Sequence, residues 1–206
     1  AQEEKKQLSK DVYDSWKDIE DSRISRDGEW VIYQPEPYKG DGKIVLWDAD
    51  ESVKQNFPRG SNAEFSPTSA YCVFHISPHE DSIRQMKLNE VPKEKRTKDS
   101  IGIYLMNDDQ LIKREKLKSF KVPEEKSNWM VFQQKEMETE NDTSEQEKPK
   151  TKVNEKAPEA TKLTVFNPVE NKEYTFENVT DYAISEDGSL VSFVRLQNDS
   201  ILKSKV

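Results

Sequence analysis

The residue types that most often carry chemistry are sparse in this chain. Its two histidines, His75 and His79, stand four residues apart, and Glu80 and Asp81 follow the second. On a helix such a pair would share one face and could bind a metal ion. The residues before Pro78 are instead typical of a strand that the proline interrupts. We therefore predict a strand-end histidine, a solvent-exposed loop histidine and no metal site, with metal binding by this pair as the alternative.

The motifs of nucleophilic and nucleotide chemistry are missing from the sequence. A hydrolase nucleophile elbow needs Gly-x-Ser-x-Gly, because only small neighbours fit its strained turn. None of the six glycines frames a serine in this way, and Gly60-Ser61 and Gly188-Ser189 are typical of turns. Neither a P-loop nor Gly-x-Gly-x-x-Gly occurs, and Asp41-Gly42-Lys43 with Asp99 lacks the spacing of a calcium loop. The sequence therefore predicts no catalytic residue and no cofactor.

The composition limits the partners of the chain. Hydrophobic residues make up 33% of its 206 residues and charged residues 35%, and the net charge is −8. An acidic chain lacks the clustered cationic surface that binds nucleic acid, and no segment here is basic and amphipathic enough for a membrane surface. The single cysteine, Cys72, excludes an internal disulfide and a zinc site built from several thiolates. The start at Ala1-Gln2 predicts a mature end left by signal peptidase, and hence an exported, periplasmic protein.

The strands that would have to position a functional site are predicted by a sequence repeat that occurs four times. Each copy has an apolar residue, a tight polar turn and a short strand that ends on an aromatic residue. Asp27-Gly28 and Asp187-Gly188 supply the positive φ that such a turn requires. The four copies span residues 24–33, 65–74, 122–132 and 184–193. A second strand pair is predicted between consecutive copies: 43–48 with 52–57, 101–105 with 116–120, and 162–167 with 173–176.

Four short antiparallel strands per repeat are typical of a propeller blade of roughly 40–45 residues. We predict an all-β fold, a partial β-propeller of about three four-stranded antiparallel blades plus the start of a fourth. Helix is expected only around residues 8–17 and in short turns. The predicted divisions are an N-terminal extension at 1–15, blades at about 16–60, 61–118 and 119–178, the start of the next blade at 179–206, and insertions at about 77–99 and 136–160.

Three further features could serve a partner. Arg59, in a connection between blades, could line a central channel and meet a peptide carboxylate, or form a salt bridge between blades. Trp30, Trp47 and Trp129 are predicted to pack in or between blades, with a ligand-stacking platform as the alternative. The Glu/Lys-rich segment 136–160 is too polar to pack and is interpreted as a charged surface loop, with a partner contact as the alternative.

The repeat also resembles a known family. Residues 65–74 and 184–193 resemble the SPDGK-type repeat of TolB-like and peptidase propellers. Further motifs occur in the order of the N-terminal propeller of bacterial prolyl oligopeptidase-family peptidases, often labelled dipeptidyl aminopeptidases. They are Trp16-Lys17-Asp18-Ile19, Asp41-Gly42-Lys43-Ile44-Val45, Pro58-Arg59-Gly60, residues 97–104 and residues 179–185.

This resemblance covers roughly residues 13–200, apart from 136–160. It implies a non-catalytic propeller that gates peptide access to a C-terminal α/β-hydrolase domain of the same parent chain, with peptides as substrates. No catalytic residue can be carried over, because no position matches those motifs. Two alternatives stay open: a free-standing propeller that binds a protein or ligand, and a homo-oligomer formed through the open blade edges.

Overall fold

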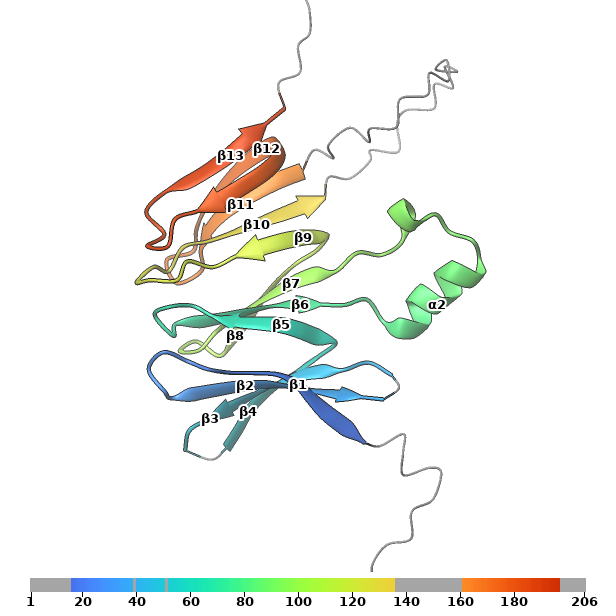
Figure 1. The fold of residues 1–206 in the computed structure, drawn as a ribbon, viewed down its shortest axis with the longest axis horizontal. Coiled ribbons are helices and arrows are strands. Elements are labelled where there is room, and N and C mark those ends of the chain that lie inside the picture. Colours follow the sequence, from blue (N-terminus) through green and yellow to red (C-terminus); the bar gives the residue numbers. More distant parts are fainter. Residues whose placement is uncertain (1–15, 39, 51, 136–160, 197–206) are drawn as a thin grey trace, which may run out of the picture.

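The chain forms three antiparallel sheets stacked face to face (Figure 1). The computed structural model describes residues 16–38, 40–50, 52–135 and 161–196. The first sheet contains β1 (Lys17–Ile24), β2 (Trp30–Pro37), β3 (Lys43–Asp48) and β4 (Ser52–Pro58). The second contains β5 (Gly60–Phe65), β6 (Tyr71–Ile76), β7 (Ser100–Leu105) and β8 (Gln110–Arg114). The third contains β9 (Leu117–Lys121), β10 (Met130–Lys135), β11 (Thr161–Asn167), β12 (Lys172–Ile184) and β13 (Val191–Arg195).

The connections between successive sheets share one backbone conformation. A single residue with left-handed backbone follows the last strand of each unit: Arg59 (φ 61°), Lys116 (φ 60°) and Asn178 (φ 61°). A left-handed L-residue is costly by about 1–2 kcal/mol, so its recurrence at three equivalent positions marks a required chain reversal. Each of their carbonyls accepts a backbone hydrogen bond, from Ser77 (2.9 Å), Lys135 (2.9 Å) and Leu196 (2.8 Å) in turn.

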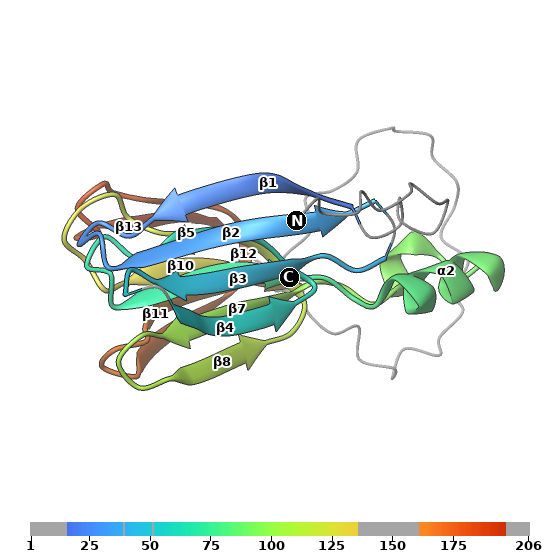
Figure 2. The same cartoon turned by 90° about the horizontal axis from the view of Figure 1, so that it is seen from below.

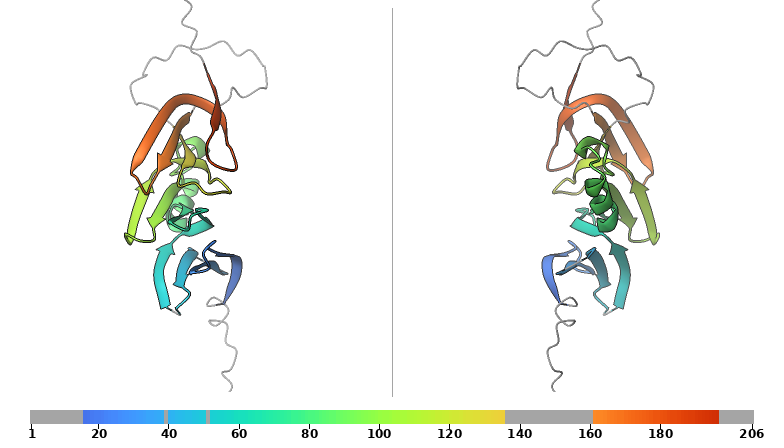
Figure 3. Two further views of the ribbon diagram at one scale, coloured as in Figure 1. Left: turned by 90° about the vertical axis from the view of Figure 1, so that its left-hand side faces the viewer. Right: turned by 90° about the vertical axis from the view of Figure 1, so that its right-hand side faces the viewer.

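The position of Asn178 shows that the third sheet is a blade plus the beginning of another. The first half of β12 pairs with β11, from Lys172 to Phe176, and its second half pairs with β13, from Val179 to Ile184. The two views of Figure 3 show the stack edge-on, with the first sheet at one end and the β12–β13 hairpin at the other. This arrangement confirms the predicted partial propeller.

Apolar side chains fill the spaces between sheets. The core between the first two sheets contains Phe57, whose ring lies 4.6 Å from that of Phe74 and 5.1 Å from that of Tyr104. The next core lies between the second and third sheets and includes Tyr71, Ile103 and Phe132, and a third core lies beneath β12 and β13. The thin apolar content of the sequence is therefore concentrated where alternating strands face a neighbouring sheet.

The predicted turns form in three of the four repeats. The hydroxyl oxygens of Ser25, Ser66 and Ser185 each accept a hydrogen bond from the backbone N–H five residues further on. The third repeat differs, because the Ser127 hydroxyl accepts from Trp129, only two residues away. Neither the second nor the third repeat has an Asp-Gly pair: Ser69 takes a positive φ of 57° in the second, and Lys126 one of 21° in the third.

Two predictions about secondary structure are wrong. The insertion at 77–99 contains a helix, α2 (Glu80–Leu88), followed by a 3₁₀ turn η1 (Lys93–Lys95), and α2 projects from one end of the sheets (Figure 2). The His79 ring accepts from the N–H of Asp81, and acidic residues in the first turn and Lys87 in the last turn favour the helix dipole.

The second error concerns strand pairing. β7 pairs with β8, whereas the 116–120 segment that was expected to pair with β7 lies largely in β9, the first strand of the third sheet. β8 was missed because it is an exposed edge strand with only two apolar residues, Leu111 and Ile112. Most of the helix expected at 8–17, and the loop at 136–160, lie outside the described residues, and Lys17 already belongs to β1. No helix in the described ranges is long and apolar enough to cross a membrane.

Candidate functional site

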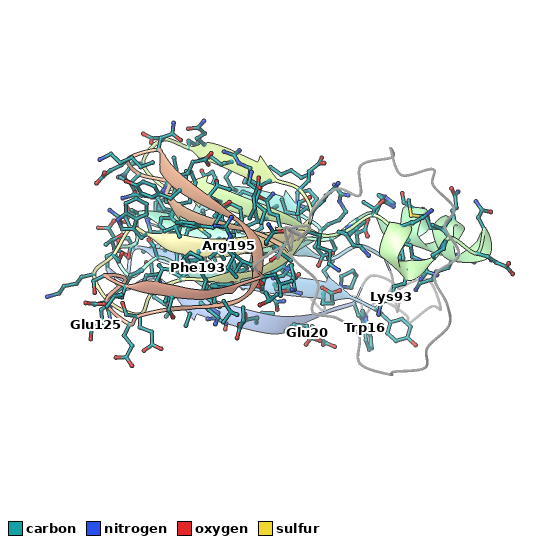
Figure 4. The ribbon with its side chains drawn as sticks, turned by 90° about the horizontal axis from the view of Figure 1, so that it is seen from above. Trp16, Glu20, Lys93, Glu125, Phe193 and Arg195 are labelled. Carbon is teal, nitrogen blue, oxygen red and sulfur yellow. The ribbon has the colours of Figure 1, made fainter. Side chains whose placement is uncertain are left out.

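A hollow lies where β1 and β2 meet. It lies on the side of the molecule from which α2 projects, where Trp16 is labelled in Figure 4. Its volume is about 570 Å³. We call it the acidic hollow; it is lined by Trp16, Asp18, Glu20, Glu36, Pro37 and Tyr38.

The β1–β2 ladder sets the positions of these side chains. Asp18 lies directly opposite Glu36 in the antiparallel register, and the Tyr38 N–H donates to the Trp16 carbonyl at 3.4 Å. The register shifts between Ile19 and Asp21, which makes Glu20 the extra residue of a bulge. A bulge re-aims a side chain, and here it leaves Glu20 lining the same hollow as Asp18.

Three carboxylates therefore share a small surface. Like charges directly opposite one another on a sheet are unfavourable. Among the described residues none of the three has an ion-pair partner within 4 Å. The Gln34 amide donates a hydrogen bond to Glu36 Oε2 at 3.2 Å. An added Cβ at Gly42 would lie 2.1 Å from Glu36 Oε2, so this glycine leaves room for the carboxylate.

Arg59 lies near this end of the molecule. Its N–H donates to the Gly42 carbonyl at 2.8 Å, and its half-buried side chain makes no ion pair with any described residue. The salt bridge between blades is thus not formed within the described part of the chain. A role for Arg59 in a central channel stays a prediction.

Each of the two histidines contacts a different acidic side chain. His75 Nδ1 lies 3.5 Å from Asp99 Oδ2, and its ring packs against Phe120. His79 Nε2 lies 3.4 Å from Asp41 Oδ2, and the same carboxylate group accepts from the N–H of Glu80. In the described ranges no group of three or more His, Cys, Asp or Glu side chains could hold a metal ion. The interpretation of His75 as a strand-end histidine is confirmed. His79 is a solvent-exposed loop residue, as predicted, and in addition it caps α2.

The tryptophans and the cysteine differ in their surroundings. Trp30 packs against the core between the first two sheets, as predicted, and the ring of Trp129 stacks on Tyr174 at 5.8 Å. Trp47 is exposed, on a first sheet that has no sheet beyond it in the described ranges, so its predicted packing is not formed there. Burial raises the pKa of the Cys72 thiol, which therefore remains protonated and unreactive at neutral pH.

Sequence reasoning missed the acidic hollow. Trp16 and Asp18 were noticed only as part of a family motif, and Glu36 and Tyr38 were not singled out. The signal available was the alternation Asp18-x-Glu20 beside an aromatic residue at the start of a strand. Only the register of β1 on β2 brings Glu36 opposite Asp18.

No protein-family model and no curated protein matches the chain. Among solved structures, an acylaminoacyl peptidase in complex with Z-Gly-Gly-Phe-chloromethyl ketone is similar at 16% identity and a TM-score of 0.51. The uncomplexed acylaminoacyl peptidase of Pyrococcus horikoshii is similar at 14% identity and a TM-score of 0.50. Each of these two matches covers 87% of this chain and 28% of the peptidase. The β-propeller domain of the Trilobed protease from Pyrococcus furiosus is similar at 13% identity and a TM-score of 0.47. This match covers 82% of this chain and 45% of the protease domain.

The chain thus spans less than half the length of these proteins. Identities this low show the fold alone. The sheet topology and the fold shared with the two acylaminoacyl peptidases define the class of protein, a partial β-propeller with an acidic, aromatic-flanked hollow between β1 and β2.

Proposed function

We propose that this chain is the non-catalytic N-terminal propeller portion of an exported serine peptidase, and that it gates peptide access to a C-terminal α/β-hydrolase domain. The observation that carries this proposal is that the third sheet contains a blade and the first two strands of a further blade. Three identical one-residue steps lead from unit to unit, and the third opens a further blade of which two strands are described.

Both ends of the stack present apolar surface. Ile19 and Ile24 on β1 are exposed, as are Leu190 and Val194 at the β13 hairpin. Isolated exposed apolar residues are ordinary, but here they gather on the first and last strands of the stack, where further blades would cover them. A longer propeller explains this placement and also protects the strand edges from aggregation.

The peptidase assignment is supported by the order of motifs in the sequence and by the fold shared with acylaminoacyl peptidases. The full-length gene product is expected to cleave dipeptidyl reporter substrates and to be blocked by a serine-reactive phosphonate. Residues 1–206 alone are expected to be inert, because they offer no activated nucleophile. Hydrolysis by the isolated chain, or a full-length product that is insensitive to the phosphonate, would contradict the proposal.

The acidic hollow favours a second candidate, a free-standing propeller that binds a ligand without any enzyme. The hollow is formed by the first sheet alone and needs no hydrolase domain. The reading frame after Val206 separates the two candidates. Several hundred residues with a Gly-x-Ser-x-Gly motif support the peptidase, and a stop codon supports the binding module.

A further inference from the structure

The insertion between β6 and β7, residues 77–99, forms a regular helix that the blades do not cover. We call this insertion the α2 arm. None of the nine residues of α2 is buried. A helix shorter than about 12–15 residues is marginal in water unless something packs against it. Ordering such a segment also costs conformational entropy. The packing of the described sheets therefore does not account for the arm.

The base of the α2 arm is tied to all three sheets. His79, at the start of the helix, contacts Asp41 in the connection between β2 and β3 of the first sheet. His75, at the end of β6, contacts Asp99 across the base of the arm. The His75 ring also packs on Phe120 of the third sheet, with 5.2 Å between the ring centres. These contacts fix the arm at its base, and an element that is already ordered loses little entropy when a partner binds it.

One face of α2 is occupied by the arm itself. Ile83 and Met86, three residues apart, are half-buried. The segment that returns to β7 bonds to this face: the Val91 N–H donates to the Met86 carbonyl at 2.9 Å, and the Thr97 hydroxyl donates to Met86 Sδ at 3.8 Å. The small apolar content of the arm is thus used to hold the returning segment on the helix.

A second face of α2 points away from this contact. Arg84, Lys87 and Leu88 are three and four residues apart and form the outer face of α2. All three are exposed, and Leu88 is 74% exposed. Neither basic residue makes an ion pair with any residue that the structure describes. The outer face therefore combines an apolar side chain with two unpaired positive charges.

The blade topology places the arm at the end of the sheets where the chain enters and leaves. A blade of four antiparallel strands begins and ends at the same end. In the second sheet Gly60, which begins β5, lies opposite Ile76, which ends β6, and Ile76 lies opposite Ser100, which begins β7. β8 ends there too, since Arg114 is paired with Ile101. The α2 arm joins β6 to β7 at this end and projects beyond the sheets (Figure 2).

The same rule fixes where a following domain would attach. In the incomplete blade, Arg195 at the end of β13 lies opposite Val179, next to the step at Asn178. A third and a fourth strand would take the chain away from this end and back to it. A chain that has completed its last blade therefore leaves the propeller at the end from which α2 projects.

We infer that the outer face of α2 docks against the domain that follows the propeller in the parent chain. The inference rests on the proposed function, because it takes such a domain to exist. Leu88 would make an apolar contact, and Arg84 and Lys87 would donate to carboxylates of the docked domain. Residues 84–98 contain six basic and two acidic residues, in a chain of net charge −8. The facing surface of the domain is therefore expected to be acidic, because it would be attracted to the arm and repelled by the rest of the chain.

Hydrogen exchange followed by mass spectrometry tests this docking. The full-length gene product is compared with the 206-residue chain, and the readout is the exchange of amides in residues 80–91. These amides should exchange at least about ten-fold more slowly in the full-length product, because docking opposes local opening of the helix. Raising the salt concentration should reduce the difference, because the basic contacts lie at the surface.

Two variants identify the surface that docks. Leu88→Asp should speed the exchange of α2 in the full-length product by about five-fold or more, and should leave the exchange of the 206-residue chain unchanged. Val169→Asp is the matched control. Val169 is a 48% exposed apolar residue in the turn between β11 and β12, at the opposite end of the sheets, and its substitution should not alter the exchange of α2.

Equal exchange of α2 in the two proteins would overturn the inference, as would equal effects of Leu88→Asp and Val169→Asp. Protection of α2 that increases with the concentration of the 206-residue chain would overturn it too, because a second copy would then be the partner. Unprotected α2 in a full-length product that the phosphonate inhibits would refute the docking alone. A protected α2 in a product that the phosphonate does not inhibit would refute the proposed peptidase and support the docking.

Discussion

The substitution Gly102→Ala tests whether the first two sheets pack as consecutive blades. Gly102 lies on β7 directly opposite Phe74 on β6. A Cβ added there would lie 2.5 Å from Phe74 Cε2 and 2.7 Å from Cζ. Optimal carbon contacts are about 3.5–4.0 Å, so the ring would have to move by roughly 1 Å.

The Phe74 ring cannot move away without displacing neighbouring side chains. Phe74 is fully buried, and its centroid lies 4.6 Å from that of Phe57 on the neighbouring sheet. Overpacking of this kind costs about 1–3 kcal/mol. Alanine is better than glycine in a strand by about 0.5–1 kcal/mol, which offsets part of the cost. We expect Gly102→Ala to lower the free energy of unfolding by about 1–2 kcal/mol.

The assay is urea unfolding followed by circular dichroism, with the slope of the transition checked for constancy. Phe74→Leu provides the control, because a smaller side chain makes room for the new methyl group. In the double variant the effect of Gly102→Ala should shrink by at least about 0.5 kcal/mol, since the two sites are in contact. Additive effects, or a Gly102→Ala chain as stable as the parent, would refute this packing.

Two further predictions concern polar groups. Hydrogen bonds from the Ser185 hydroxyl, and from the N–H and hydroxyl of Ser189, lower the pKa of Asp187 to about 2, so the turn should keep this stabilisation above pH 3.8 and lose it as the pH falls through about 2. A carboxyl titration by NMR with a midpoint near 4, or one that Ser185→Ala does not raise, would contradict this. The buried amide nitrogen of Gln133 has no hydrogen-bond partner among the described residues, although its oxygen accepts from Ser119. Gln133→Met should therefore raise the free energy of unfolding by about 1 kcal/mol, and a lower urea midpoint would count against this.

Local features determined much of the fold directly from the sequence. Asp27-Gly28 and Asp187-Gly188 require a tight turn wherever they stand, and both form it with positive φ at the glycine. The strands that pack on both faces, such as β6 and β7, are mostly apolar or aromatic along their length, so they were found where they were expected. Cys72 lies in such a run, and its burial followed from that pattern.

Tertiary structure decided what depends on contacts between distant residues. β8 has little apolar character and forms because it pairs with β7. α2 is stabilised by its His79 cap, which contacts Asp41 in the connection between β2 and β3. The acidic hollow likewise required a register, since nothing local relates Asp18 to Glu36 across 18 residues of sequence. Turn chemistry and apolar alternation act over a few neighbouring residues and can be recognised from the sequence, whereas strand pairing and charge placement are set by the packed fold.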